Sequence, residues 1–481
     1  MPTFDADPLA SSPPRLRQTL TVWDVVTMNV VAVVTLRWIT RAARMGPASL
    51  VLWALAWLVF FVPLASAVRE LSSRYPEQGG IYAWTRRAFG PTHGFICGWC
   101  LWVNNLFYFP SMLLFAGANA LLIFGGRYAA LADSHLYSVA FVLAMLWASA
   151  ALGVAGFRAG RWLNTIGALA IWVPAGLLIV CGSIAAATSG SATSFAPADF
   201  VPRGEFWGTL SLWSGVCFAF SGFEVSALVG QEVKAARRTI PRGVLLGGLL
   251  ATIIYTAGTA AVLVAIPSAA LSERTGLADV VSQVAGRAGL GGLSAVAGGL
   301  LALGMIAGSA AWFASAGRVP FAVGEDGGFP RAFTRLHARF RTPHLALLAQ
   351  GIAASGLFLV SVFLTVAGAR TTVQEAYDIL VNLTILVYFV PYLYLFLSLV
   401  KLRTQRTDAP EETHVAGGRR GLLLAAGAGI AATVISLVLV FVPPAGTGNV
   451  VNYEVNVIGQ TAALVACGLA VLWWARRERR P

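Results

Sequence analysis

The sequence predicts an all-α integral membrane protein with twelve transmembrane helices. Charged residues make up only 11% of the chain and hydrophobic residues 57%, whereas soluble domains carry about 25% charged residues. The apolar runs have the length of helices and do not alternate, which excludes a membrane barrel. Lys and Arg gather in every second loop, which is the pattern of cytoplasmic loops.

The excess of basic over acidic residues follows from this topology. The formal net charge is +13, and most of the Lys and Arg residues fall on the side that also holds both ends of the chain. We therefore expect cytoplasmic N- and C-termini and a place in the cell's inner, or plasma, membrane. The charge indicates topology, and no nucleic-acid partner is expected.

Charge-free runs mark the candidate spans in chain order. They cover residues 25–36, 48–68, 94–126, 136–157, 162–198, 206–223, 243–272, 288–317, 345–369, 379–400, 421–453 and 455–475. A polar, Pro-rich segment precedes them, and its composition is typical of a short cytoplasmic tail. The division that we expect is a tail at 1–20, a ten-helix core at 21–403, a cytoplasmic loop at 404–420, helices 11 and 12 at 421–475, and a tail at 476–481.

The first and sixth spans are the least continuous. The first has only 12 uncharged residues between Asp24 and Arg37, too few for the roughly 20 that a crossing needs. In the sixth, Ser221 and Gly222 weaken the helix just before Glu224. If the core consists of two five-helix halves, these spans occupy corresponding positions, which is the sequence-level sign of a site at mid-membrane. The prediction is that helices 1 and 6 are discontinuous and meet around a small solute.

Candidate binding residues come from the two interruptions and from one amide in the third span. Backbone groups freed by a break can bind ions or a carboxylate, and amides in hydrocarbon seek partners. The candidates are Val34, Thr35, Leu36, Arg37, Asn104, Phe218, Phe220, Ser221, Gly222 and Phe223.

Two charged residues stand at these interruptions. Glu224 is an acid at the end of an apolar run, and an intramembrane acid is a functional candidate by default, here for coupling or gating. The alternative is a structural acid paired with a hydroxyl or backbone group. Arg37 is either a counter-charge for an anionic group or a side chain that extends to surface water.

Other kinds of chemistry have little support in the sequence. There is no GxxxxGK[ST] or HExxH motif and no long soluble segment, so an ATP-driven pump or a membrane protease is disfavoured. Cys97 and Cys100 form one CxxC spacing without a second pair, and we expect them to pack in the core. No catalytic residue, metal or cofactor is predicted.

Four segments carry a family resemblance. Residues 70–99, 231–242, 317–333 and 382–403 resemble, in order and spacing, signatures of the amino acid–polyamine–organocation (APC) superfamily of permeases. The resemblance covers about residues 20–475. It implies a five-plus-five inverted-repeat core resembling the leucine transporter fold, with two added helices. It also implies secondary active transport of amino acids or related amines by alternating access, either proton-coupled or by exchange.

The first span departs from the family pattern. Many relatives have a Gly-rich break there, whereas this chain has no glycine between Asn29 and Gly46, and Thr35, Leu36 and Arg37 occupy the expected break. The region is similar to the glutamate–aminobutyrate exchanger branch. A polyamine or organocation carrier, and a transport-inactive sensor or partner subunit on the same fold, remain alternatives. The sequence leaves the substrate, the coupling ion and the oligomeric state open.

Overall fold

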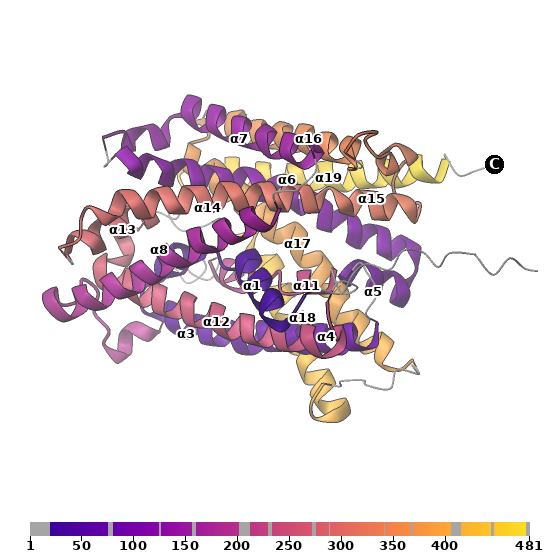
Figure 1. Ribbon diagram of the computed structural model, residues 1–481, viewed down its shortest axis with the longest axis horizontal. Coiled ribbons are helices and arrows are strands. Elements are labelled where there is room, and N and C mark those ends of the chain that lie inside the picture. Colours follow the sequence, from indigo (N-terminus) through magenta and orange to yellow (C-terminus); the bar gives the residue numbers. More distant parts are fainter. Residues whose placement is uncertain are drawn as a thin grey trace, which may run out of the picture.

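The computed structural model describes residues 20–75, 80–124, 127–155, 160–201, 212–228, 233–271, 276–287, 289–340, 342–366, 369–405, 415–443 and 447–477. Within them the chain is almost wholly helical, and its long helices lie side by side along one common direction (Figure 1).

By length and composition, eight helical segments among the described residues could each cross a membrane. The first is Ala48–Arg74, which joins α3 (Ala48–Ala56), the π-helical η1 (Trp57–Phe61) and α4 (Val62–Arg74). The second is Pro91–Phe124, which joins α6 (Pro91–Ala120) and η2 (Leu121–Phe124). The others are α7 (His135–Ala155), α12 (Ala236–Ala265), α16 (His344–Phe363), α17 (Val373–Arg403), α18 (Gly418–Leu439) and α19 (Val450–Arg477).

Two further long helices, α8 (Gly160–Ser189) and α14 (Leu293–Ala316), contain the shorter apolar helical stretches Trp172–Thr188 and Ala295–Ala310. All these helices overlap charge-free runs of the sequence, which supports the predicted all-helical membrane protein. The total of twelve spans stays a prediction.

The first and sixth runs are interrupted where the sequence predicts. In the first, α1 (Val22–Val33) is separated from α2 (Arg37–Ala43) by three non-helical residues. In the sixth, α10 (Trp213–Phe218) and α11 (Val225–Leu228) flank a non-helical segment, 219–224. The start of that run, 206–211, lies outside the described residues.

Local chemistry explains the second interruption. The Ser221 hydroxyl donates to the carbonyl oxygen of Phe218 at 2.6 Å, and such local bonds compete with helical ones. Gly222 follows with a φ of +102°, which is accessible to glycine and strained for other residues. The helix ends at Phe218, and these two residues keep it from resuming before Val225.

The helices α5 (Gly80–Phe89) and α15 (Arg318–Glu325) and the 3₁₀ turn η7 (Arg331–Thr334) gather at one end of the bundle (Figure 1). Arg86 forms an ion pair with Asp326, and the Tyr82 hydroxyl donates to the same carboxylate at 2.7 Å. Burial, and next this hydrogen bond, raise the pKa of Tyr82, so it remains a donor at neutral pH.

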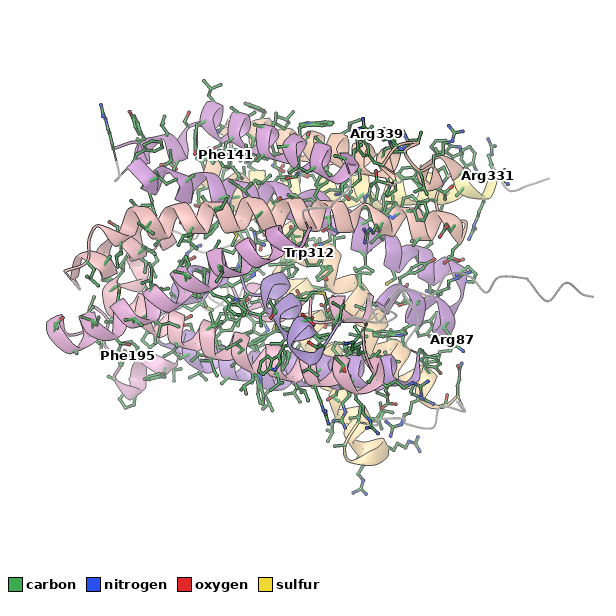
Figure 2. The ribbon with its side chains drawn as sticks, viewed as in Figure 1. Arg87, Phe141, Phe195, Trp312, Arg331 and Arg339 are labelled. Atoms are coloured by element: carbon green, nitrogen blue, oxygen red, sulfur yellow. The ribbon has the colours of Figure 1, made fainter. Side chains whose placement is uncertain are left out.

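Basic side chains mark this same end of the molecule. Figure 2 shows Arg87 and Arg331 at the end that holds α5 and α15, whereas Phe195 lies towards the opposite end. This distribution agrees with the expected cytoplasmic side.

Short elements complete the described connections. They are η3 (Ala129–Asp133), η4 (Pro197–Phe200), η6 (Ser268–Ala270), α13 (Gly276–Arg287), and the antiparallel strands β1 (Thr365–Val366) and β2 (Ala369–Arg370).

The packing places the interrupted helices inside the molecule. α1 packs along α12, α10 packs against α2, α17 and α18, and α17 packs along α6. Figure 1 shows α1 and α11 in the middle of the bundle rather than at its outline. Any site formed at the two interruptions is therefore enclosed by helices.

Candidate functional site

The two interrupted helices run antiparallel to each other through the middle of the bundle. As the residue numbers rise along the first segment, the numbers of the residues they contact in the second segment fall. The contacts pair Val33 with Gly222, Trp38 with Phe218, and Arg41 with Gly215. The non-helical parts of both segments therefore lie opposite each other.

Tyr255 of α12 joins the two interruptions. Its hydroxyl lies 2.9 Å from the carbonyl oxygen of Val33 and 3.2 Å from that of Ala219, and it shares its proton between them. These are carbonyls at the points where α1 and α10 end, so they have no further helical turn to bond. One fully buried hydroxyl thus satisfies backbone groups of both breaks.

Glu224 is held by groups from α17 and from its own segment. Tyr388 donates to its Oε1 at 2.7 Å, and Tyr392 donates to its Oε2 at 2.7 Å. The Gly222 amide lies 3.1 Å from Oε2 and also donates to the Tyr392 hydroxyl at 2.8 Å. The carboxylate, only 4% exposed, is therefore fixed against the second interruption by three donors.

Arg37 is the first residue of α2, and its charge is buried at the first interruption. The side chain is 1% exposed, so it does not reach surface water, and that alternative from the sequence is wrong in this arrangement. Its Nη1 donates to the Ser111 hydroxyl at 3.1 Å. The guanidinium carbon lies 4.5 Å from the ring centre of Trp38 and 5.0 Å from that of Tyr108, which are cation–π distances.

Several polar atoms here have no hydrogen-bond partner among the described residues. They are Nε and Nη2 of Arg37, the Thr35 hydroxyl, both amide atoms of Asn29 in α1, and Oδ1 of Asn104 in α6. Asn104 lies one helical turn before Tyr108, which contacts Arg37. Buried polar groups normally have partners, so unsatisfied groups gathered beside an interruption mark a place for a polar ligand.

Aromatic rings connect the two charged groups. Trp38 lies 5.2 Å from Phe218, and Phe218 lies 5.5 Å from Tyr388, between ring centres. Because Arg37 packs on Trp38 and Glu224 is bound by Tyr388, these three rings form a continuous aromatic wall from the cation to the anion. We call Trp38, Phe218 and Tyr388 the aromatic wall.

Two predicted site residues have core contacts instead. Phe220 packs edge-on to Trp53 at 5.6 Å, and Phe223 packs edge-on to Phe61 at 5.2 Å. Both are fully buried. In this arrangement they anchor the second interruption against α3 and η1.

The structure thus brings together most of the residues predicted from the sequence. The two breaks contribute Val34, Thr35, Leu36, Arg37, Phe218, Ser221, Gly222 and Glu224.

Sequence reasoning missed four polar residues that complete the site: Ser111, Tyr255, Tyr388 and Tyr392. The sequence did contain a sign of the two tyrosines of α17. A buried tyrosine hydroxyl needs a hydrogen-bond partner, and Tyr388 and Tyr392 are four residues apart, so they lie on one face of the same helix.

At the end of the bundle opposite α5, a chain of hydrogen-bonded side chains connects several helices. Arg41 Nη2 donates to Asn382 Oδ1 at 3.0 Å, and Asn382 Nδ2 donates to the Tyr453 hydroxyl at 2.8 Å. Tyr453 in turn donates to the carbonyl oxygen of Val440 at 2.6 Å. We call Arg41, Asn382 and Tyr453 the Arg41 relay; it joins α2 to α17, α18 and α19.

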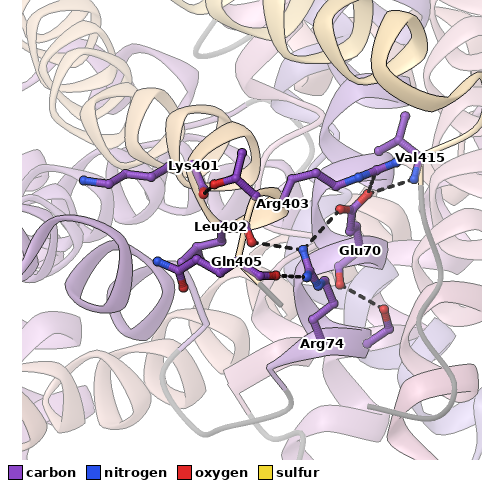
Figure 3. A network of polar contacts seen from close by, with 9 residues as sticks. Glu70, Arg74, Lys401, Leu402, Arg403, Gln405 and Val415 are labelled. Atoms are coloured by element: carbon purple, nitrogen blue, oxygen red, sulfur yellow. Dashed lines mark hydrogen bonds and ion pairs between the residues drawn. The ribbon is translucent and has the colours of Figure 1, made fainter. Parts of the chain in front are cut away.

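A second polar network joins α4 to α17 at the α5 end (Figure 3). Glu70 of α4 forms an ion pair with Arg403 of α17 and a second one, at 3.8 Å, with Arg74. Its carboxylate also accepts the amide of Val415 at 2.8 Å. We call Glu70, Arg74 and Arg403 the α4–α17 latch.

The Arg74 guanidinium extends this latch to the backbone after α17. It donates to the carbonyl oxygens of Leu402 at 3.0 Å and Gln405 at 2.6 Å. With the relay at one end and the latch at the other, the interruptions are enclosed on both sides.

The described cavities lie elsewhere in the bundle. One is lined by Pro174, Leu178 and Leu293 among others, and the second by Leu113 and Phe141 among others. Neither includes a residue of the two interruptions.

Comparisons with known proteins agree with this architecture. A sequence model described as amino acid permease matches residues 20–467. An uncharacterised transporter of Legionella pneumophila is 28% identical over 446 residues, covering 92% of this chain and 94% of the relative.

Two relatives from Lactococcus lactis bear the names of their substrates. A probable agmatine/putrescine antiporter is 23% identical over 401 residues, covering 83% of each chain. A glutamate/gamma-aminobutyrate antiporter is 24% identical over 434 residues, covering 89% of this chain and 84% of the relative.

Proposed function

Because the chain belongs to the amino acid permease family, we propose that it is a secondary active transporter that moves amino acids or related amines across the inner membrane. It is a transporter rather than an enzyme, as the family and the matched relatives are transporters. The observation that carries the proposal is the meeting of two interrupted helices around the buried charges of Arg37 and Glu224.

The proposed architecture has twelve spans, of which the first ten form a five-plus-five inverted repeat resembling the leucine transporter fold. Its support is the antiparallel course of α1–α2 and α10–α11, since corresponding helices of inverted halves run in opposite directions. In this proposal residues 21–403 are the core and 421–475 hold helices 11 and 12. The 404–420 loop and the tails at 1–20 and 476–481 lie in the cytoplasm.

The proposed cycle is alternating access around the fixed site. The substrate lies between the interruptions, and the Arg41 relay and the α4–α17 latch open in turn. Each closure joins elements that must separate when its side opens: α2 from α17 at one end, and α4 from α17 at the other. The latch is at the end with the basic loops, so it guards the cytoplasmic side.

Glu224 is the proposed coupling or gating group. Its carboxylate joins the second interruption to α17 through Tyr388 and Tyr392. A movement of that segment relative to α17 must break or exchange these bonds, and so must a change in the carboxylate's charge. Substrate occupancy, protonation and helix position are therefore linked at this residue, whether the cycle is proton-coupled or an exchange.

The names of two relatives favour exchange, since both are antiporters. The two names differ in the class of substrate, because glutamate and gamma-aminobutyrate carry a carboxylate, whereas agmatine and putrescine do not. The proposed function therefore includes both classes, and the site chemistry must choose between them.

The test is exchange by the purified protein in liposomes. Vesicles are loaded with one unlabelled solute and supplied outside with the labelled form of the same solute. The panel comprises acidic, neutral and basic amino acids together with agmatine and putrescine. We expect saturable exchange for at least one solute and uptake that stops when the vesicles are empty.

The matched control is Arg476→Gln, which changes an exposed arginine that donates a hydrogen bond to Thr92. This variant should exchange like the wild-type protein. Absence of exchange or uptake for every solute, in vesicles that hold folded protein, would remove the transport proposal in favour of a sensor or partner subunit.

A further inference from the structure

The Arg37 side chain presents an unused edge beside the first interruption. Its Nη1 is bound to the Ser111 hydroxyl, and that hydroxyl donates to the carbonyl oxygen of Tyr108 at 2.9 Å. The ring faces of Trp38 and Tyr108 hold the guanidinium plane. Nε and Nη2 are buried, and no described residue bonds to either of them. The described residues therefore orient the cation, and none of their carboxylates neutralises it.

No carboxylate in the described part of the chain forms an ion pair with Arg37. Glu224, the acid at the other interruption, already accepts from Tyr388, Tyr392 and Gly222. Arginine cannot relieve the cost of burial by losing its proton. A buried guanidinium without a counter-ion is costly, and this one is retained at the centre of the bundle.

The two free nitrogens define the shape of the missing partner. Nε–H and Nη2–H point in parallel from one edge of the guanidinium, and this edge matches the two oxygens of a carboxylate. The neighbouring Thr35 hydroxyl, 3% exposed and without a hydrogen-bond partner among the described residues, supplies a further polar contact. A carboxylate accepts both parallel donors at once and also neutralises the guanidinium charge, which a neutral acceptor does not do.

We propose that the Nε–Nη2 edge of Arg37 is the subsite for the substrate's carboxylate, and that it makes the transporter selective for amino acids over amines without a carboxylate. This inference rests on the proposed transport function and deepens it. The aromatic wall then places the rest of the substrate between Arg37 and Glu224. In this break, which has no glycine, the Arg37 side chain binds the anionic group of the substrate.

The magnitude of the selectivity follows from the bonds that an analogue without the carboxylate would lose. A ligand without the carboxylate leaves the guanidinium edge unpaired in a dry site, and sites built to bond a polar group reject analogues that lack it strongly. Two hydrogen bonds to a charged group are lost, so we expect a preference on the order of 100-fold for the carboxylate-bearing member of a matched pair. Arg37→Lys would keep the positive charge but lose the pair of parallel N–H donors.

The experiment compares pairs of solutes that differ by one carboxylate: ornithine with putrescine, and arginine with agmatine. Binding to the purified protein is measured by ligand-dependent shifts of the thermal midpoint, and transport by competition against exchange in liposomes. The wild-type protein should favour the amino acid of each pair about 100-fold. Arg37→Gln should remove this preference, Arg37→Lys should retain a small part of it, and Arg476→Gln should keep all of it.

The unliganded thermal midpoint separates this role from a structural one. Arg37→Gln removes a buried charge that lacks a counter-ion, so the variant should be at least as stable as the wild-type protein without ligand. A large loss of stability would assign Arg37 to packing and overturn the subsite.

Two other outcomes would also overturn the Arg37 subsite. Equal competition by both members of each pair, or an unchanged preference in Arg37→Gln, overturns the subsite while the transporter stands. Failure of every solute to bind or exchange overturns the subsite and the proposed function together.

Discussion

Glu224 shows how one side chain can stabilise an interrupted helix. The carboxylate accepts the Gly222 amide, which a continuous helix would bond internally, and the hydroxyls of Tyr388 and Tyr392 from α17. Hydrogen bonds to a charged group contribute about 1.5–3 kcal/mol each. Removing a partner therefore affects both the geometry of the break and its attachment to α17.

Glu224→Gln is the sharpest single test at this scale. A glutamine keeps one of the two acceptor oxygens, and its Nε2 donor takes the place of the oxygen that accepts from one tyrosine hydroxyl. Loss of one charged hydrogen bond of about 2 kcal/mol predicts exchange slowed by at least about tenfold, measured as the initial rate in liposomes. The pH dependence of the rate should also flatten.

Tyr388→Phe provides the matched comparison, because it removes one donor and leaves the carboxylate. It should slow exchange less than Glu224→Gln and keep its pH dependence. Wild-type rates in Glu224→Gln from pH 5 to 8 would exclude a coupling or gating role.

At the scale of elements, the closed arrangement depends on bonds between helices that are distant in sequence. The α4–α17 latch joins the ends of two helices through an ion pair whose carboxylate is 1% exposed. Breaking a buried pair by removing one partner typically costs about 3–5 kcal/mol. The latch is therefore a large part of what keeps the α5 end closed.

Glu70→Ala should open that end. Arg74 and Arg403 would then face each other without an acid between them. The expected result is a lower thermal midpoint and faster maleimide labelling of buried Cys97, followed by peptide-resolved mass spectrometry.

A double-mutant cycle provides the control. Because Glu70 and Arg403 contact each other, Glu70→Ala combined with Arg403→Ala should be less destabilising than the sum of the single changes. Additive effects and unchanged labelling of Cys97 would contradict the latch.

At the scale of the whole molecule, the basic residues orient the bundle. Arg87 and Arg331 lie at the end with α5 and α15, and Phe195 lies towards the other end (Figure 2). In the proposed topology, which follows the positive-inside rule, the latch lies at the cytoplasmic end and the Arg41 relay at the outer end.

Cysteine labelling in intact cells tests this orientation. In a Cys467→Ser background, Arg331→Cys should react with a membrane-impermeant maleimide only after the cells are opened. Ser194→Cys, on the other side, should react in intact cells. Both positions are exposed, so the difference reports sidedness. The reverse pattern would invert the proposed topology.

By itself, the sequence determined the membrane-embedded helical fold and both interruptions. These features depend on hydropathy and on helix-weakening residues within one short segment, such as Ser221 and Gly222. It also identified Glu224 and Arg37, since a charge in an apolar run is visible without coordinates.

Only the tertiary structure decided what these charges contact. Tyr388 and Tyr392 lie 164 and 168 residues from Glu224 in the chain, and no local pattern specifies which of many aromatic residues packs there. The contrast between a Glu224 carboxylate that the protein satisfies and an Arg37 edge that it leaves open is likewise a property of packing. It arises because hydrogen-bond partners in a helical bundle come from whichever faces meet, and those faces are set by the whole fold.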